Sequence, residues 1–144
     1  MSYQKKQQSD LEFGLNSELE FYKIIKHMGF KRTKIFEQFD YFNPTTKCLI
    51  ELKTRRISSI DYDTTIIPKS KLDWLKFYPN QHPSTRAFFV VKFTDKTLCL
   101  ELIETKLKYY TGGYIYRTNR IDMNIHYFIE INLFSEFDIN IIDI

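Results

Sequence analysis

The stretch FEQFDYFNPTTKCLIELKTRR, residues 36–56, contains the hairpin that decides the fold. Its aromatic and β-branched residues predict two strands, over residues 36–42 and 46–53. Asn43-Pro44 and the two threonines that follow predict the turn between them. The rest of the chain can be placed around this hairpin.

Three charged residues of the hairpin form a pattern of their own. Glu51 and Lys53 lie two residues apart on the second predicted strand, so their side chains share one face. A hairpin pairs residues symmetrically about its turn, so we expect Asp40 nearly opposite Glu51. A register slip of one residue would turn Asp40 to the other face.

The bulk composition fits a single domain, residues 1–144. A hydrophobic content of 43% and an aromatic content of 17% exclude a disordered tail. The net charge of +3 is too small to indicate a nucleic-acid partner by itself, so the clustering of the charge matters more. Three basic clusters flank the acidic hairpin: Lys31, Arg32 and Lys34; Lys53, Arg55 and Arg56; and Lys69, Lys71 and Lys76.

The sequence predicts an intracellular protein, cytoplasmic or nuclear. Cys48 and Cys99 lie in apolar strand-like runs, which favours buried free thiols in a reducing compartment. The N-terminal residues MSYQKKQQSD are polar, unlike a signal peptide. The chain also has no apolar run near the roughly 18 residues of a membrane span. We therefore expect neither secretion nor a membrane partner.

The order of the other predicted elements indicates an α/β fold. Apolar residues at helical spacing predict a first helix over residues 11–27, which ends at Gly29. A short strand is predicted over residues 64–67, and a second helix over 69–78, with Pro68 in its first turn. We expect a mixed central sheet with one helix on each side of the hairpin. Further strands are predicted over residues 86–93, 97–104 and 127–133, with a turn at Gly112-Gly113.

The charged residues of the hairpin have the chemistry of a magnesium site for phosphodiester hydrolysis. Magnesium is bound by hard oxygen ligands and uses only one or two carboxylates, which Asp40 and Glu51 supply. The backbone carbonyl of Leu52 adds a third oxygen, and Lys53 adds a cation for water or phosphate. Glu18, four residues after Gly14 on the first predicted helix, adds another carboxylate.

Asp40 followed by Glu51-Leu52-Lys53 resembles the PD-(D/E)XK nuclease superfamily, which includes restriction endonucleases, Holliday-junction resolvases and many phage and viral nucleases. The resemblance covers residues 11–93 and implies the restriction-endonuclease-like αβββαβ core with extra C-terminal strands. Phe39 departs from the family pattern, which has Pro before the aspartate.

Two further segments resemble the same superfamily. Gly14 and Glu18 resemble its helical acid, and residues 64–72 resemble its strand-then-helix segment, where Lys69 or Lys71 faces the site.

The resemblance implies an endonuclease that uses Mg²⁺, for which Mn²⁺ can substitute, and acts on DNA as a homodimer. The small single domain, without a separate specificity module, favours branched or structure-specific DNA, as for a Holliday-junction resolvase, over other DNA structures, which stay open. The implied roles are metal binding by Asp40, Glu51 and the Leu52 carbonyl, water activation by Lys53 and assistance by Glu18. The implied DNA contacts are Lys69, Lys71, Arg55 and Arg56.

The residues leave two alternatives open. The chain could be a non-catalytic nucleic-acid-binding or interaction module on the same fold, with Glu51 and Lys53 as solvated residues of an edge strand. The intact set of Asp40, Glu51 and Lys53 argues against a decayed site. The second alternative is cleavage of RNA, which the same chemistry allows.

Overall fold

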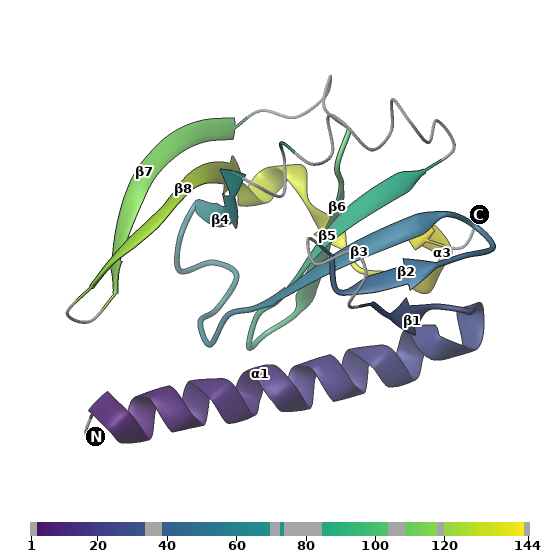
Figure 1. Ribbon diagram of the computed structural model, residues 1–144, viewed down its shortest axis with the longest axis horizontal. Coiled ribbons are helices and arrows are strands. Elements are labelled where there is room, and N and C mark those ends of the chain that lie inside the picture. The colour runs from purple at the N-terminus through teal and green to yellow at the C-terminus, as the bar shows by residue number, and fades with distance from the viewer. Residues whose placement is uncertain are drawn as a thin grey trace.

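The computed structural model describes residues 3–33, 39–69, 73, 85–103, 109–117 and 120–142. Helix α1, Tyr3–Ile25, runs beneath a six-stranded mixed sheet of order β1-β2-β3-β5-β6-β9 (Figure 1). A second sheet, of order β4-β8-β7, packs on the face of the six-stranded sheet that is opposite α1. The strands of the first sheet are Lys31–Arg32, Tyr41–Asn43, Cys48–Thr54, Arg86–Lys92, Thr97–Glu101 and Ser135–Glu136.

The predicted hairpin is present as β2 and β3, and its predicted register is confirmed. Tyr41 pairs with Ile50, and the same antiparallel register brings Asp40 beside Glu51. Buried Asn43 fixes the turn, because its Oδ1 accepts hydrogen bonds from the backbone N–H groups of Thr45 and Thr46 at 3.0 and 3.3 Å. The first strand is shorter than predicted and begins at Tyr41. Residues 34–38 lie outside the described residues.

Helix α1 differs from its prediction in both its start and its buried face. It begins at Tyr3, not near residue 11, because Lys and Gln in its first turns are good helix formers. Only part of the apolar spacing is buried, because Phe21 and Ile25 pack against the sheet while the leucines lie on a neighbouring face of the helix. The exposed apolar residues are Leu11, Leu15, Leu19 and Ile24.

The predicted end of α1 is confirmed. A 3-10 turn, Lys26–Met28, is followed by Gly29 at φ +97°, a left-handed conformation that glycine adopts without strain. None of the helices in the described part of the chain has both the length and the apolar character needed to cross a membrane.

Strand β3 lies between two hydrophobic cores. Ile50 and Leu52 belong to the core that includes Phe21 and Ile25 of α1. Leu49 points the other way, into a core built with the second sheet. That sheet consists of β4, β7 and β8, at Thr64–Pro68, Tyr109–Arg117 and Arg120–Glu130.

The second sheet is therefore the described cover of this face. Of the predicted helix over residues 69–78, only residues 69 and 73 lie within the described part of the chain, and both are helical. Pro68 is the last residue of strand β4 and does not lie in the first turn of a helix.

The C-terminal third contains the largest departures from the sequence prediction. The predicted turn at Gly112-Gly113 is wrong, because both glycines lie within β7, where its register with β8 is irregular. The late strand ends at Glu130, and a 3-10 turn, Ile131–Leu133, follows it. The apolar tail packs on the domain through α3, Ile139–Ile142, which buries Ile142 against the core on the α1 side.

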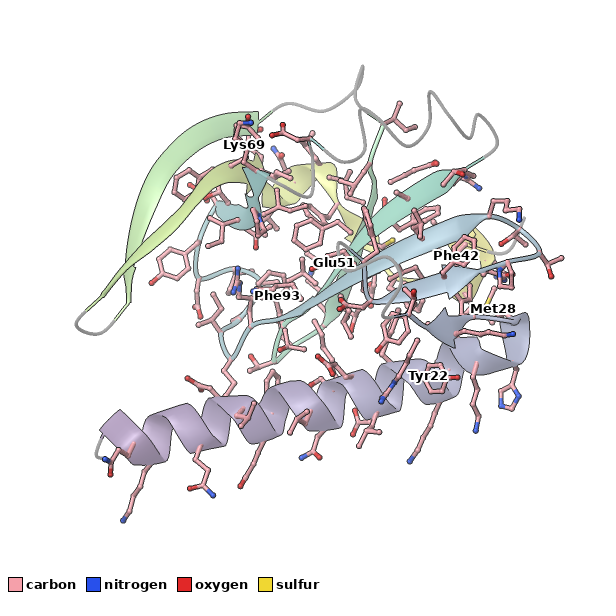
Figure 2. All side chains as sticks on the ribbon, viewed as in Figure 1. Tyr22, Met28, Phe42, Glu51, Lys69 and Phe93 are labelled. Carbon is pink, nitrogen blue, oxygen red and sulfur yellow. The ribbon has the colours of Figure 1, made fainter. Side chains whose placement is uncertain are left out.

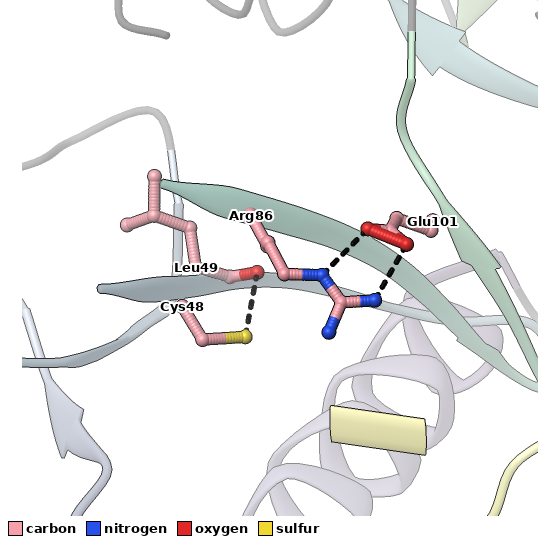
Figure 3. A network of polar contacts seen from close by, with 4 residues as sticks. All are labelled: Cys48, Leu49, Arg86 and Glu101. Atoms are coloured by element: carbon pink, nitrogen blue, oxygen red, sulfur yellow. Dashed lines mark hydrogen bonds and ion pairs between the residues drawn. The ribbon is translucent and has the colours of Figure 1, made fainter. Parts of the chain in front are cut away.

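An ion pair joins β5 to β6 at the end of the sheet where β3 begins. Arg86 donates from Nε and Nη2 to the carboxylate of Glu101 at 2.8 and 2.6 Å, beside Cys48 (Figure 3). The predicted buried free thiols are confirmed, and burial raises the pKa of Cys48 to about 12. This thiol is therefore protonated and unreactive at neutral pH.

A candidate nuclease site at the end of strand β3

A cleft of about 1380 Å³ lies between the C-terminal end of β3 and the N-terminal half of α1. It brings together residues from three parts of the sequence: the helix, the bend before β2, and β3 with the residues after it. Seven of the predicted site residues line it: Glu18, Asp40, Glu51, Leu52, Lys53, Arg55 and Arg56.

Asp40 is held at the edge of β3 by its main chain and its side chain. Its backbone N–H donates to the Ile50 carbonyl at 3.0 Å, which continues the β2–β3 ladder by one bond. Its Oδ2 then accepts the backbone N–H of Leu52 at 2.8 Å. A side chain thus replaces the main-chain partner at the point where strand pairing stops, and the carboxylate is fixed beside the strand.

The carbonyl of Leu52 points to the same edge. The N–H and C=O of one strand residue lie on the same side of the strand, and the Leu52 N–H is directed at Asp40. The described part of β2 pairs only with Cys48–Ile50, so this carbonyl lies beyond the paired region. The Leu52 side chain is buried under α1, which anchors the strand at this position.

Glu51 and Lys53 leave β3 on the opposite face from Leu52, as predicted from their spacing. Both are half-buried and line the cleft, and Figure 2 labels Glu51 on β3. The backbone of Glu51 pairs with Phe89 of β5, and that of Lys53 with Val91, in parallel register. Pairing between β3 and β5 therefore holds the backbone of both charged residues in place.

Helix α1 brings Glu18 to the same cleft. A Cβ on Gly14 would lie 3.3 Å from Oγ1 of Thr54, so glycine allows a close approach of the helix to β3. The pKa of Glu18 is raised, first by burial and then by the negative charge of Asp40, while Arg32 lowers it. The two carboxylates are therefore close enough to repel each other.

The basic residues predicted to contact DNA fall into two groups. Arg55 and Arg56 line the cleft, and Arg56 Nη1 is tied to Asp10 Oδ1 of α1 at 3.0 Å. Lys69 is not part of the cleft lining and forms an ion pair with Asp73. Lys71 lies outside the described residues.

The donor set of the cleft fits a hard divalent cation. Asp40, Glu51 and the Leu52 carbonyl present only oxygen atoms, which Mg²⁺ and Mn²⁺ prefer. Within the described ranges, no three His, Cys, Asp or Glu side chains form a metal-binding group by themselves. An ion held here would use two carboxylates, a carbonyl and water, which is how Mg²⁺ is usually bound.

The sequence prediction missed the part of the cleft formed by the first turns of α1. Gln4 and Gln8 line it with their amide side chains, and Leu11 and Leu15 add an apolar margin. Lys and Gln, which are good helix formers, are frequent in residues 3–10, and this composition could have predicted a helix that begins near residue 3.

The comparisons with known proteins agree with this fold. The family model described as "Phage putative PDDEXK endonuclease" matches residues 2–137. Among solved structures, the chain is similar to Hjc, a Holliday junction resolvase from the archaeal hyperthermophile Archaeoglobus fulgidus. The TM-score is 0.57 at 15% sequence identity, over 90% of this chain and 94% of that chain. This likeness shows a shared restriction-endonuclease-like fold. No curated protein sequence matches the chain.

Proposed function

The chain belongs to the phage PDDEXK endonuclease family, and on that premise we propose that it is a divalent-metal-dependent endonuclease that hydrolyses DNA. The observation that carries the proposal is the junction at the edge of β3. There the Asp40 carboxylate is bonded to the Leu52 N–H, in one cleft with Glu51 and Lys53. Mg²⁺ is the proposed ion, and Mn²⁺ is proposed to substitute for it.

In this proposal Asp40, Glu51 and the Leu52 carbonyl hold the ion, and the Leu52 N–H keeps the Asp40 carboxylate oriented. When bound, the ion supplies positive charge that stabilises the phosphate in the transition state and acidifies the attacking water. Lys53, on the same face as Glu51, holds that water or a phosphate oxygen. Glu18 adds negative charge from the helix side, which favours cation binding.

Arg55 and Arg56 are proposed to contact the phosphates of the DNA next to the cut. Both line the cleft within three residues of Lys53. Lys69 and Lys71 are kept as proposed contacts farther from the cut, since Lys69 is not in the cleft lining. DNA affinity should fall steeply with salt, because each phosphate contact releases counterions.

Branched DNA and a homodimer complete the proposal. Leu11, Leu15 and Leu19 recur every four residues on α1 and are 63%, 51% and 50% exposed. A second copy packed on this stripe would cover it with the same apolar surface, as two-fold dimers do. Because Leu11 and Leu15 also line the cleft, such packing would bring two clefts together, which suits a substrate with two strands to cut.

The test compares cleavage of plasmid, four-way-junction and single-stranded DNA in Mg²⁺, in Mn²⁺ and in EDTA. We expect metal-dependent cleavage that Lys53→Ala and Glu51→Gln reduce by at least about 100-fold, the lower range for removing one positioned catalytic group. The matched control is Lys96→Ala, because Lys96 is exposed in the turn between β5 and β6.

Each variant must keep the thermal unfolding midpoint of a folded protein. Undiminished cleavage by both cleft variants would refute the assignment of the site. Binding of DNA without cleavage in any metal would instead support a non-catalytic nucleic-acid-binding module on this fold.

A further inference from the structure

A second, smaller cavity lies next to the cleft. Its volume is about 210 Å³, below the roughly 300–1,000 Å³ of pockets for drug-sized ligands, so it fits one planar ring system. Arg55 and Ile57 line both cavities, which makes the small one a continuation of the cleft. The residues that line it come from the segment after β3, from β4 and β8, and from Phe93, directly after β5.

The lining combines aromatic rings with hydroxyl groups and one guanidinium. Phe93 is buried, Phe128 is half-buried and Tyr62 is 66% exposed. Thr64 and Thr65 add hydroxyls, and Arg55 adds its guanidinium. Aromatic rings and arginine planes are the groups on which proteins stack unpaired bases, and hydroxyls can bond to base edges.

The segment that carries Tyr62 is fixed at both of its ends. The N–H of Thr94 donates to the Ile57 carbonyl at 3.0 Å, and the N–H of Ile131 donates to the Asp63 carbonyl at 2.8 Å. Between them, buried Ser59 donates from N and Oγ to the Asp95 carboxylate at 2.8 and 2.6 Å.

These bonds hold the segment so that Ile60 and Tyr62, 85% and 66% exposed, project from it. Of the two, Tyr62 lines the cavity, and a large ring exposed on a fixed loop gains contact area when a ligand covers it.

The cavity is also at a useful distance from the proposed chemistry. Arg55 follows Lys53 by two residues, which is about 7 Å along an extended chain. DNA whose phosphate lies at Lys53 would therefore have a base within a few nucleotides of the cavity. In Figure 2 the labelled Phe93 and Glu51 lie in neighbouring parts of the view, in agreement with the shared lining.

We propose that this cavity binds one unstacked nucleobase of the substrate, with Tyr62 stacking on the base at the rim and Phe93 and Phe128 forming the apolar wall. The inference rests on the proposed nuclease function and narrows its substrate class. DNA with an unpaired base near the cut, as at a bulge or a branch, can fill the cavity without the cost of breaking a base pair. A perfectly paired duplex has to pay that cost first.

The test measures binding in EDTA, where cleavage is absent, so that it does not depend on catalysis. One duplex carries a single bulged adenosine, and a second carries an abasic residue at the same place. Affinities are measured by fluorescence anisotropy for the wild type, Tyr62→Ala and Ile60→Ala. Ile60 is the matched control, because it is the more exposed of the two and does not line the cavity.

The wild type should bind the bulged base roughly tenfold more tightly than the abasic bulge, the effect of one base–aromatic stack. Tyr62→Ala should reduce this ratio to about one, and Ile60→Ala should keep it, as expected for a specific coupling between Tyr62 and the base. An equal ratio in the wild type and Tyr62→Ala would overturn the proposal. Loss of the ratio in Ile60→Ala would also overturn it.

The same proteins are then assayed for cleavage in Mg²⁺. Cleavage without base discrimination in the wild type would leave the nuclease proposal standing and overturn the cavity assignment. Base discrimination without any cleavage would support the cavity assignment and overturn the nuclease proposal.

Discussion

Replacing Asn43 by alanine should destabilise the protein strongly, because this one buried side chain makes three hydrogen bonds to the backbone. Asn43 is 1% exposed. Its Nδ2 donates to the Met28 carbonyl at 2.8 Å, at the end of the helical segment. Its Oδ1 accepts from Thr45 and Thr46 at 3.0 and 3.3 Å, in the turn between β2 and β3. Alanine removes all three hydrogen bonds and leaves their partners without Asn43.

Each hydrogen bond contributes about 1 kcal/mol net, so Asn43→Ala should cost about 3 kcal/mol of unfolding free energy. For a chain of 144 residues this corresponds to a drop of roughly 10 °C in the unfolding midpoint. The cost is measured by urea unfolding, followed by circular dichroism, at one pH. The control is Asn16→Ala, because Asn16 is exposed on α1 and alanine is the better helix former.

A loss below about 1 kcal/mol for Asn43→Ala would refute this reasoning, since water would then have replaced all three bonds at almost no cost. A similar loss in Asn16→Ala would show that the measurement reports α1 rather than the turn. The expected difference between the two variants is what tests the role of Asn43.

Two further predictions concern α1. The pKa of Glu18 is raised above 4.5 in the folded protein by burial and by Asp40, so the folded state binds this proton more tightly than the unfolded chain. Protonated Glu18 therefore stabilises the folded state. This stabilisation is complete below the unfolded pKa and is lost as pH rises through the folded pKa. Glu18→Gln should therefore raise the unfolding midpoint in EDTA at neutral pH but not below pH 4.5, and an unchanged midpoint across this pH range would contradict the repulsion between Glu18 and Asp40. Mg²⁺ should raise the midpoint of the wild type more than that of the variant. Leu19→Glu should convert the proposed homodimer to a monomer, as measured by sedimentation equilibrium. Ile24→Glu is the control and should stay dimeric, because Ile24 is equally exposed but lies outside the leucine stripe. Equal masses for the two variants would exclude the stripe as the interface.

The hairpin could be predicted from sequence because local rules determine it. Asn43 and the residues after it form a turn through bonds within four positions, and the turn then sets which residues of β2 and β3 pair. The position of Asp40 relative to Glu51 follows from that register alone. Alternation along β3 then places Lys53 on the same face as Glu51, with no information needed from the rest of the chain.

The surroundings of α1 could not be predicted in this way. Leu11, Leu15 and Leu19 have helical spacing, which ordinarily indicates a buried face. Burial also requires a partner surface, and the sheet lies against the helix face that carries Gly14, Ser17 and Phe21, so the leucines on the neighbouring face are exposed. Likewise, β4 pairs with β8, more than fifty residues later, and no local pattern specifies such a pairing.

The exposure pattern of β3 explains how one strand can both hold the core together and carry the site. Its first three residues, Cys48–Ile50, are buried on both faces, and from Glu51 onward only Leu52 is buried. The strand is thus anchored by Ile50 and Leu52 under α1, while the other face leaves the core where Glu51 begins. Strand pairing with β2 stops at the same position, and the Leu52 N–H bonds instead to the Asp40 side chain. At this one position the Glu51 face turns from the core to the cleft, the Leu52 carbonyl lies beyond the described pairing with β2, and the Asp40 carboxylate is fixed beside both. Moving Glu51 by one position would bury its charge under α1, which explains why the acid follows the apolar run rather than interrupting it.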